Sequence, residues 1–332
     1  MELRNHILKL AAVVVIGLFA FSPAAPVRVQ YGFQNVNTLE DLEETEAFSF
    51  SVISDNHGSS PIDNIEMAKM SKWVYNSKDA FVLGVGDHLQ KNKDNDFLTF
   101  LIRNEWWKNN FYPTIADAEN DYFGSGQSDW GSGGQLLNLI GLNRRNNVQM
   151  NPNGAEYYAQ MKVDDITVHY IVLHFPDNPG DIKIAFPESS KQFLINTLNH
   201  INKTENDIII VSAHSMYGSW IDCLSPAQQH IVNRKCDLLL AGTTHYFERR
   251  TPEGLENSGP LMLSAGSVNK ARWGSVNGFL QVHVMRNPLS LVVQYVNTDD
   301  SENKLQASPY SYVKYINGGV YPLSFTISIA GI

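Results

Sequence analysis

Four short clusters of Asp, His, Ser, Thr and Gly contain the residues best suited to chemistry in this sequence. They are Ser54-Asp55-Asn56-His57-Gly58, Gly86-Asp87-His88, Ser212-Ala213-His214 and Gly242-Thr243-Thr244-His245. The two carboxylates of Asp55 and Asp87 and the two imidazoles of His57 and His245 suit a divalent or trivalent metal such as Zn, Mn or Fe. A carboxylate such as Asp87 can also bridge two metals, and a metal pair activates water for the hydrolysis of phosphate esters.

Each cluster directly follows an apolar run that is typical of a buried strand. The runs are Phe48–Ile53, Phe81–Val85, Ile208–Val211 and Leu238–Ala241, rich in Val, Ile, Leu and Phe. Ligands of open α/β sheets bind at the edge formed by the carboxyl ends of the strands. The side chains of all four clusters are therefore expected to meet at one sheet edge.

Strands and helices alternate along the chain, which favours an α/β fold. We expect a helix to begin near Ser60-Pro61 and others to cover Phe97–Trp107 and Glu188–Ile201, with a further strand at Ile166–Leu173. The later part is richer in strands, expected at Pro260–Ala265, Phe279–Val284 and Leu289–Val296. Residues 301–332 show some alternation but contain no motif that we can assign.

The composition is that of an acidic globular protein. The chain has 332 residues with 25 Lys and Arg against 34 Asp and Glu, a formal net charge of −9. A nucleic-acid-binding protein would carry a basic face, so no nucleic-acid partner is expected.

The first residues have the features of an export signal. Arg4 and Lys9 precede the apolar stretch Leu10–Phe21, and the small residues of Ser22-Pro23-Ala24-Ala25 allow cleavage. The stretch is shorter than the roughly 20 residues of a membrane span, although an uncleaved anchor is an alternative. We expect a signal peptide over 1–25, a polar linker over 26–47, and a secreted or periplasmic mature protein without a stable membrane span.

Export leaves the pairing of the two cysteines open. Cys223 and Cys236 flank an expected helix that Ser225 caps and that has Pro226 in its first turn. An oxidising compartment permits a disulfide, but the geometry of the helix decides whether the sulfurs meet.

The order and spacing of the clusters resemble the calcineurin-like metallophosphoesterases, the family that includes purple acid phosphatases. That family has D-x-H, G-D, G-N-H-[DE], a lone H after a strand, and G-H-x-H. The resemblance covers about Phe48–Val296, which corresponds to a metallophosphoesterase domain over 48–298 followed by a C-terminal extension over 299–332. It implies a four-layer α/β sandwich in which two mixed sheets pack face to face with helices outside.

By this resemblance the first metal site is complete. Asp55, His57 and His245 match its terminal ligands, and Asp87 matches the bridging ligand. The second site is altered, because Asp117 stands in place of a ligating Asn and Thr243 replaces a ligating His. His214 matches the lone histidine, so Asp87, Asp117 and His214 remain as its ligands and as the catalytic residues. One tightly bound metal ion (Mn, Fe or Zn) and a less certain second ion are expected.

Ala118 occupies the position of the family's histidine that contacts substrate and assists the leaving group, a role worth roughly 10²–10⁴-fold in rate. The sequence therefore leaves two functions open. One is an exported metal-dependent phosphoester hydrolase, a phosphatase or phosphodiesterase of low activity that acts on a phosphorylated small molecule. The other is a weakened or inactive protein of the same fold that acts as a binding partner or scaffold.

Several other residues have a structural as well as a functional interpretation. His88 and His174 are expected to support the site or the fold rather than to bind metal, and His169 and His283 to be satisfied core residues. The glycine-rich loop Gly124–Gly134 is either a surface insertion or a mobile lid that Trp130 closes over the pocket.

Overall fold

The computed structural model describes residues 46–62, 64–90, 96–116, 134–174, 186–214, 220–249, 259–270, 276–299, 307–316 and 320–322. All of them belong to one compact unit, Val36–Ile332. The predicted signal peptide over 1–25, Asp117, Ala118 and Trp130 lie outside the described residues. Within those residues no helix is both long and apolar enough to cross a membrane.

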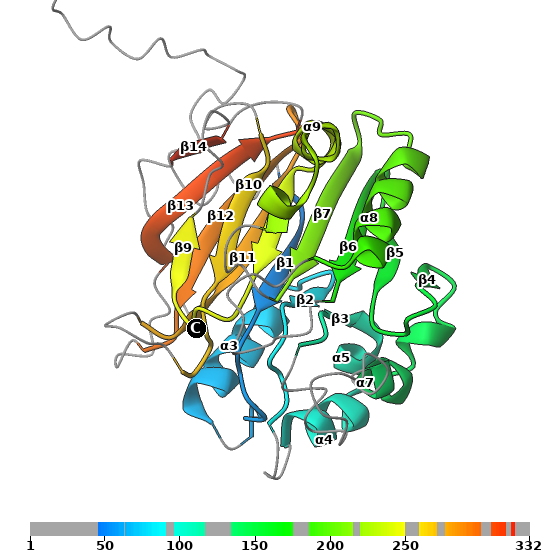
Figure 1. Ribbon diagram of the computed structural model, residues 1–332. Helices are drawn as coiled ribbons and strands as arrows, with labels where there is room; N and C mark the ends of the chain where they lie inside the picture. Colours follow the sequence, from blue (N-terminus) through cyan, green and yellow to red (C-terminus); the bar gives the residue numbers. More distant parts are fainter. Residues whose placement is uncertain are drawn as a thin grey trace, which may run out of the picture. The chain divides into compact units, whose positions relative to one another are not determined.

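The first sheet has seven strands among the described residues (Figure 1). Its order is β14 (Val320–Pro322), β13 (Ala307–Tyr315), β12 (Ser290–Asn297), β11 (Gly278–Met285), β1 (Glu46–Ile53), β2 (Val82–Gly84) and β3 (Phe111–Pro113). Strands β1, β2 and β3 are parallel, whereas β11 pairs with β1 in the antiparallel sense. This mixed pairing places the carboxyl ends of β1 and β2 side by side.

The second sheet also has seven described strands. Its order is β4 (Val148–Met150), β5 (Tyr157–Val163), β6 (Ile166–Leu173), β7 (Asp207–Ala213), β8 (Leu238–Ala241), β10 (Leu261–Ala265) and β9 (Phe247–Arg249). Strands β6, β7, β8 and β10 are parallel, so the carboxyl ends of β7 and β8 also meet at one edge.

Alternating side chains of the strands build two apolar layers. In β7, Ile208 and Ile210 belong to the large core that also contains Val282 of β11, whereas Ile209 and Val211 pack in a second cluster. That second cluster holds Leu194 of α8 (Glu188–His200) and Val232 of α9 (Pro226–Lys235). The large core therefore includes the space between the sheets, and α8 and α9 cover the outer face of the second sheet.

Helix α3 (Ile65–Asn76) covers the outer face of the first sheet. Trp73 packs edge-on against Phe279 and donates a hydrogen bond of 2.7 Å from Nε1 to Gln281 Oε1. Phe279 and Gln281 contact α3, so Leu280 and Val282, which alternate with them along β11, lie on the face towards the second sheet. The expected four-layer sandwich of two mixed sheets flanked by helices is confirmed.

Two helix boundaries differ from the sequence-based expectation. The Phe97–Trp107 segment forms two helices, α4 (Asp96–Arg103) and α5 (Glu105–Asn110), because Asn104 leaves the helical conformation and caps α5 by accepting from Trp107 N. Helix α3 begins after Asn64, whose Oδ1 accepts from Met67 N at 2.9 Å, and not at Ser60-Pro61. In both places an Asn side chain satisfies backbone donors of the first turn.

The capped helix near the cysteines is confirmed, since Ser225 and Gln228 form a reciprocal capping box with Pro226 in the first turn. Cys223 and Cys236 are free cysteines. Burial raises the pKa of the Cys236 thiol, so this side chain behaves as an apolar group in the cluster beneath α9.

The predicted domain boundaries remain predictions, but three strands extend beyond the predicted 48–298 domain. Strand β1 begins at Glu46, within the predicted linker over 26–47. Strands β13 and β14 lie in the 299–332 segment and extend the first sheet through pairs such as Val292 with Val313.

A buried carboxylate beneath α3 makes stability depend on pH. Asp79 accepts hydrogen bonds from Ser49 Oγ, Ser51 Oγ and Gln281 Nε2 at 2.6–2.7 Å, yet burial raises its pKa from 3.8 to about 6. The protonated form is favoured in the folded state, so its contribution is complete below pH 4 and is lost as pH rises towards 6. The loss is about 3 kcal/mol at 1.36 kcal/mol per pKa unit.

We expect Asp79→Asn, which stays neutral at every pH, to become progressively more stable relative to the parent protein between pH 4 and pH 7. Urea unfolding at several pH values measures the difference in unfolding free energy. The parent protein is the control for every other titrating group. A difference that stays constant over this range contradicts the prediction.

Candidate metal centre

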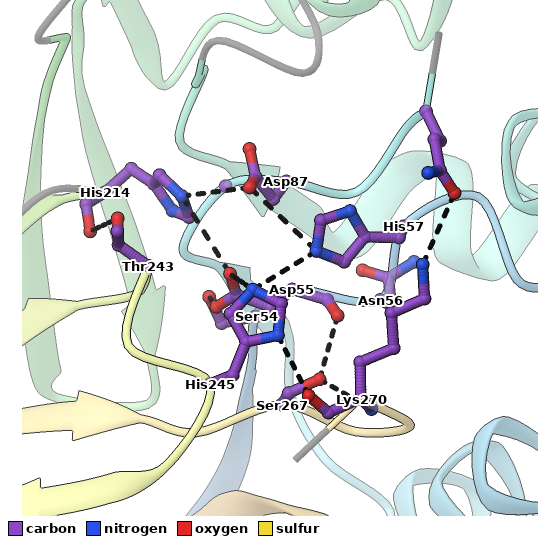
Figure 2. Close-up of polar contacts among 12 residues, drawn as sticks. Ser54, Asp55, Asn56, His57, Asp87, His214, Thr243, His245, Ser267 and Lys270 are labelled. Carbon is purple, nitrogen blue, oxygen red and sulfur yellow. Dashed lines mark hydrogen bonds and ion pairs between the residues drawn. The ribbon is translucent and has the colours of Figure 1, made fainter. Parts of the chain in front are cut away.

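Four side chains converge at the shared edge of the two sheets (Figure 2). Asp55 and His57 follow β1, Asp87 follows β2 and His245 follows β8. One ligand atom from each lies within 4.8 Å of the other three, a grouping that could hold a metal ion. The prediction that distant segments bring these residues together is confirmed.

The distances between these atoms suit a common central ion. His245 Nε2 lies 3.2 Å from Asp55 Oδ1 and 3.3 Å from His57 Nε2, and His57 Nε2 lies 4.0 Å from Asp87 Oδ2. Ligands held about 2.1 Å from one ion are themselves separated by roughly 3–4 Å. The group therefore has the dimensions of a metal coordination shell.

Hydrogen bonds to the backbone orient the two imidazoles that come from the second sheet. His245 Nδ1 donates to Lys270 O at 2.9 Å, and His214 Nδ1 donates to Val85 O at 2.6 Å. Each ring is thereby held with Nε2 directed towards the carboxylates. A backbone partner on the far nitrogen is the usual way of fixing a metal-binding histidine.

The backbone of the ligand loops adopts an uncommon conformation. The φ angles of Asp55, His57, Asp87 and His245 are 52°, 46°, 53° and 59°. Residues other than glycine rarely adopt this left-handed region, which costs roughly 1–2 kcal/mol per residue. Such strain is characteristic of sites where the chain must aim several side chains at one point.

Backbone hydrogen bonds between the first two loops stabilise this conformation. The amides of Asp55, His57 and Gly58 donate to the carbonyls of Gly86, Asp87 and His88 at 3.1, 2.9 and 2.7 Å. The loop after β1 is thus fixed to the loop after β2 beyond the ends of both strands.

His214 lies beside this group, not within it. Its Nε2 is 3.3 Å from Asp87 Oδ2 and 3.9 Å from Asp55 Oδ1. Thr243, which replaces a histidine of the family pattern, donates from Oγ1 to His214 O at 3.0 Å. The threonine hydroxyl thus supports the His214 backbone. Asp117, the remaining predicted ligand of a second ion, lies outside the described residues.

The electrostatics of the cluster favour a bound cation. Burial, assisted by the nearby charge of Asp87, raises the pKa of Asp55 to about 7, and burial lowers the pKa of His57 to about 4. Burial also opposes ionisation of His214, but the carboxylates of Asp87 and Asp55 raise its pKa well above the usual value. Without a cation, these groups share protons to limit their mutual repulsion.

Two buried atoms provide a direct test of whether a metal fits. Asp55 Oδ1 and His214 Nε2 are buried and make no hydrogen bond to any described residue. A buried polar atom without a hydrogen bond costs about 1–3 kcal/mol, which a coordinated cation would offset. The oxygen and nitrogen donors suit Mn, Fe or Zn.

Lys270 is a site residue that we did not predict from the sequence. It follows β10 at the same sheet edge, and its positive charge is one of the causes that lower the pKa of His57. Its position shortly after an apolar strand is the feature of the sequence from which it could have been predicted. The side chains of His57 and Asp87 are the more accessible ones of the cluster, 15% and 13% exposed.

Of the other histidines, His88 and His174 support the fold around the site as expected, whereas His283 is only partly satisfied, because its buried Nε2 makes no hydrogen bond to a described residue. His88 Nε2 accepts from Gly86 N at 3.1 Å and Nδ1 contacts Asn56 Oδ1, so this ring braces the two ligand loops. His174 Nδ1 donates to Ile115 O. His169 pairs with Tyr158 and Asp207, and His283 pairs with Glu46.

No protein-family model matches the sequence, and no curated protein matches it. Solved structures do match it. A purple acid phosphatase from yellow lupin aligns over 85% of this chain and 53% of its own, with 13% identity and a TM-score of 0.51. The chain has the calcineurin-like metallophosphoesterase fold.

Two further structures match with lower TM-scores. A zebrafish dimetal phosphatase covers 77% of this chain and 98% of its own, with 12% identity and a TM-score of 0.48. A Plasmodium protein, described as the anchor in the inner membrane complex, covers 81% and 89% with 16% identity and a TM-score of 0.48. The metallophosphoesterase fold places the carboxyl ends of β1, β2, β7 and β8 where the candidate metal centre lies.

Proposed function

We propose that this protein is an exported, metal-dependent phosphoester hydrolase with one tight metal site and an altered second site. The observation that carries the proposal is the convergence of Asp55, His57, Asp87 and His245, with ligand atoms within 4.8 Å of one another. The fold supports the proposal, because a purple acid phosphatase has the same architecture. Export is inferred from the features of residues 1–25.

In this proposal the metal supplies Lewis acidity and lowers the pKa of water. The chain then contributes orientation and charge. Lys270 attracts the phosphoester to the accessible side of the cluster, and His214, held by Val85 O, directs its Nε2 towards Asp87. We propose that Asp117 completes a weaker second ion site with Asp87 and His214.

The substrate that fits best is a phosphorylated small molecule with a good leaving group. Ala118 provides no proton for a poor leaving group, so esters whose alcohol has a low pKa should suffer least. Aryl phosphates such as p-nitrophenyl phosphate and bis(p-nitrophenyl) phosphate are the appropriate first substrates.

The test combines metal analysis with turnover. We expect the purified protein to retain about one Mn, Fe or Zn per chain, to hydrolyse an aryl phosphate slowly, and to lose activity on chelation and regain it on metal addition. Lys270→Gln should raise KM about tenfold, which corresponds to one charge-assisted hydrogen bond. Lys162→Gln, the same change at an exposed residue of β5, is the matched control.

Absence of bound metal after reconstitution would refute the proposal. Tight metal binding without turnover on any aryl phosphate would instead favour the inactive binding protein, for which the occupied hydroxyl of Thr243 is the structural argument.

A further inference from the structure

A second pocket lies between α3 and α5, and it shares no residue with the candidate metal centre. Its volume is about 750 Å³, and its walls include Tyr75, Trp106 and Trp107. Helix α3 covers the outer face of the first sheet, so a pocket lined by α3 and α5 lies on the outside of the sandwich. Neither the packing of the two sheets nor the metal centre described above accounts for a cavity at this position.

The walls of this pocket are apolar and exposed to an unusual degree. Tyr75 is 83% exposed and Trp106 is 39% exposed. Large aromatic groups in water forgo the free energy that their burial would provide. Their retention around one cavity points to a ligand that covers them.

The floor of the pocket is rigid. Trp107 is buried and packs edge-on against Phe97 and Phe100, with ring centroids 6.4 and 5.5 Å apart. Asn104 caps the helix that carries both tryptophans, through the 3.1 Å bond from Trp107 N. A ligand would therefore meet a largely preformed surface and lose little binding energy in ordering it.

The charged groups around the pocket favour an anion. Lys72 and Lys78 line it, and no ion pair joins either lysine to a carboxylate of the described residues. The lining carboxylate, Asp79, is 4% exposed and accepts hydrogen bonds from Ser49, Ser51 and Gln281. Two lysines thus line this pocket, both exposed, in a chain whose net charge is −9.

The backbone at Lys78 gives an independent indication. Its φ is 53°, just after the C-cap residue Ser77 of α3, a position where glycine is strongly favoured. A lysine in this conformation is less stable than a glycine would be. The Lys78 side chain thus lies at the pocket although its backbone conformation destabilises the C-terminal end of α3.

We propose that this pocket binds an amphipathic anion, namely a carboxylate attached to an alkyl or aryl body. The rings of Tyr75, Trp106 and Trp107 contact the apolar body, and the ammonium groups of Lys72 and Lys78 hold the carboxylate. This site does not depend on the metal centre or on phosphoesterase activity.

The test compares octanoate with octanol, which has the same chain length but no charge. Calorimetry and ligand-observed NMR on the full protein should show a Kd on the order of 1 mM for octanoate, given the modest binding energy per atom of such ligands. Octanol should bind about tenfold more weakly, because it lacks the charge-assisted contacts. Equal affinity for the two ligands, or no binding of octanoate, would overturn the proposal.

Variants of the two lysines distinguish the effect of lost charge from the effect of lost folding. The double variant Lys72→Gln and Lys78→Gln should weaken octanoate about tenfold and leave octanol unchanged, whereas Lys162→Gln should change neither. Lys78→Gly should weaken octanoate while raising the melting temperature, which excludes loss of folding as the cause. Unchanged octanoate affinity in the double variant would show that the lysines do not hold the carboxylate, and the proposal would be wrong.

Discussion

Replacing Asp87 by Asn should remove bound metal and phosphoesterase activity while leaving the fold intact. Asp87 Oδ2 lies 3.3 Å from His214 Nε2 and 4.0 Å from His57 Nε2, between the complete first site and the altered second one. A carboxamide has nearly the same shape but loses the negative charge. We expect metal affinity to fall more than about 100-fold, since even an outer partner of a metal ligand contributes roughly 10–100-fold.

Metal content by mass spectrometry and turnover of p-nitrophenyl phosphate measure this effect, and the melting temperature reports on the fold. Asp79→Asn is the matched control, because it makes the same change at a buried aspartate beneath α3. If the Asp87 variant keeps its metal as tightly as the parent protein, then this carboxylate is not a ligand and the proposed site is wrong.

The second large effect is expected from Gly86→Ala. Gly86 has a φ of 89°, and a Cβ there would lie 2.5 Å from His214 Nδ1 and 2.9 Å from Ala116 Cβ. His214 is buried and bonded to Val85 O, so it has little room to move. Overpacking of this kind costs about 1–3 kcal/mol beyond the strain of the left-handed backbone.

Gly154→Ala isolates the clash from the strain. Gly154 has a similar φ of 77°, but its Cβ would meet no atom within 4 Å. Urea unfolding of both variants should show that Gly86→Ala is the more destabilised by roughly 1–3 kcal/mol. If the two variants lose equal stability, close packing against His214 is not the reason for glycine at this position.

The α/β class and the strands could be predicted because the buried strands are continuous apolar runs, whereas the four-layer sandwich was implied by the family resemblance. Residues 166–173 and 238–241 form strands with the predicted bounds, and the cluster after each expected strand end does lie at the common edge. Helix boundaries were harder, because Asn64 and Asn104 cap their helices through side-chain bonds that depend on the local conformation. Strand β13 was missed, because its weak alternation becomes meaningful only beside β12.

For the site, residue type and order predicted which side chains meet, but not how they are held. The left-handed backbone of Asp55, His57, Asp87 and His245 leaves no signature in the sequence, since these are not glycines. Lys270 was missed because a lone lysine after a strand is common on protein surfaces. Its role depends on the turn that gives His245 Nδ1 a carbonyl partner.

Three of the bonds that join the loop after β1 to the loop after β2 run from amide to carbonyl. The side chains that also join these loops, Asn56 and His88, are not predicted metal ligands. The backbone geometry of the metal centre therefore does not depend on the side chains that would bind the metal. The same fold can therefore accommodate either an active hydrolase or an inactive protein that retains the structure of the site.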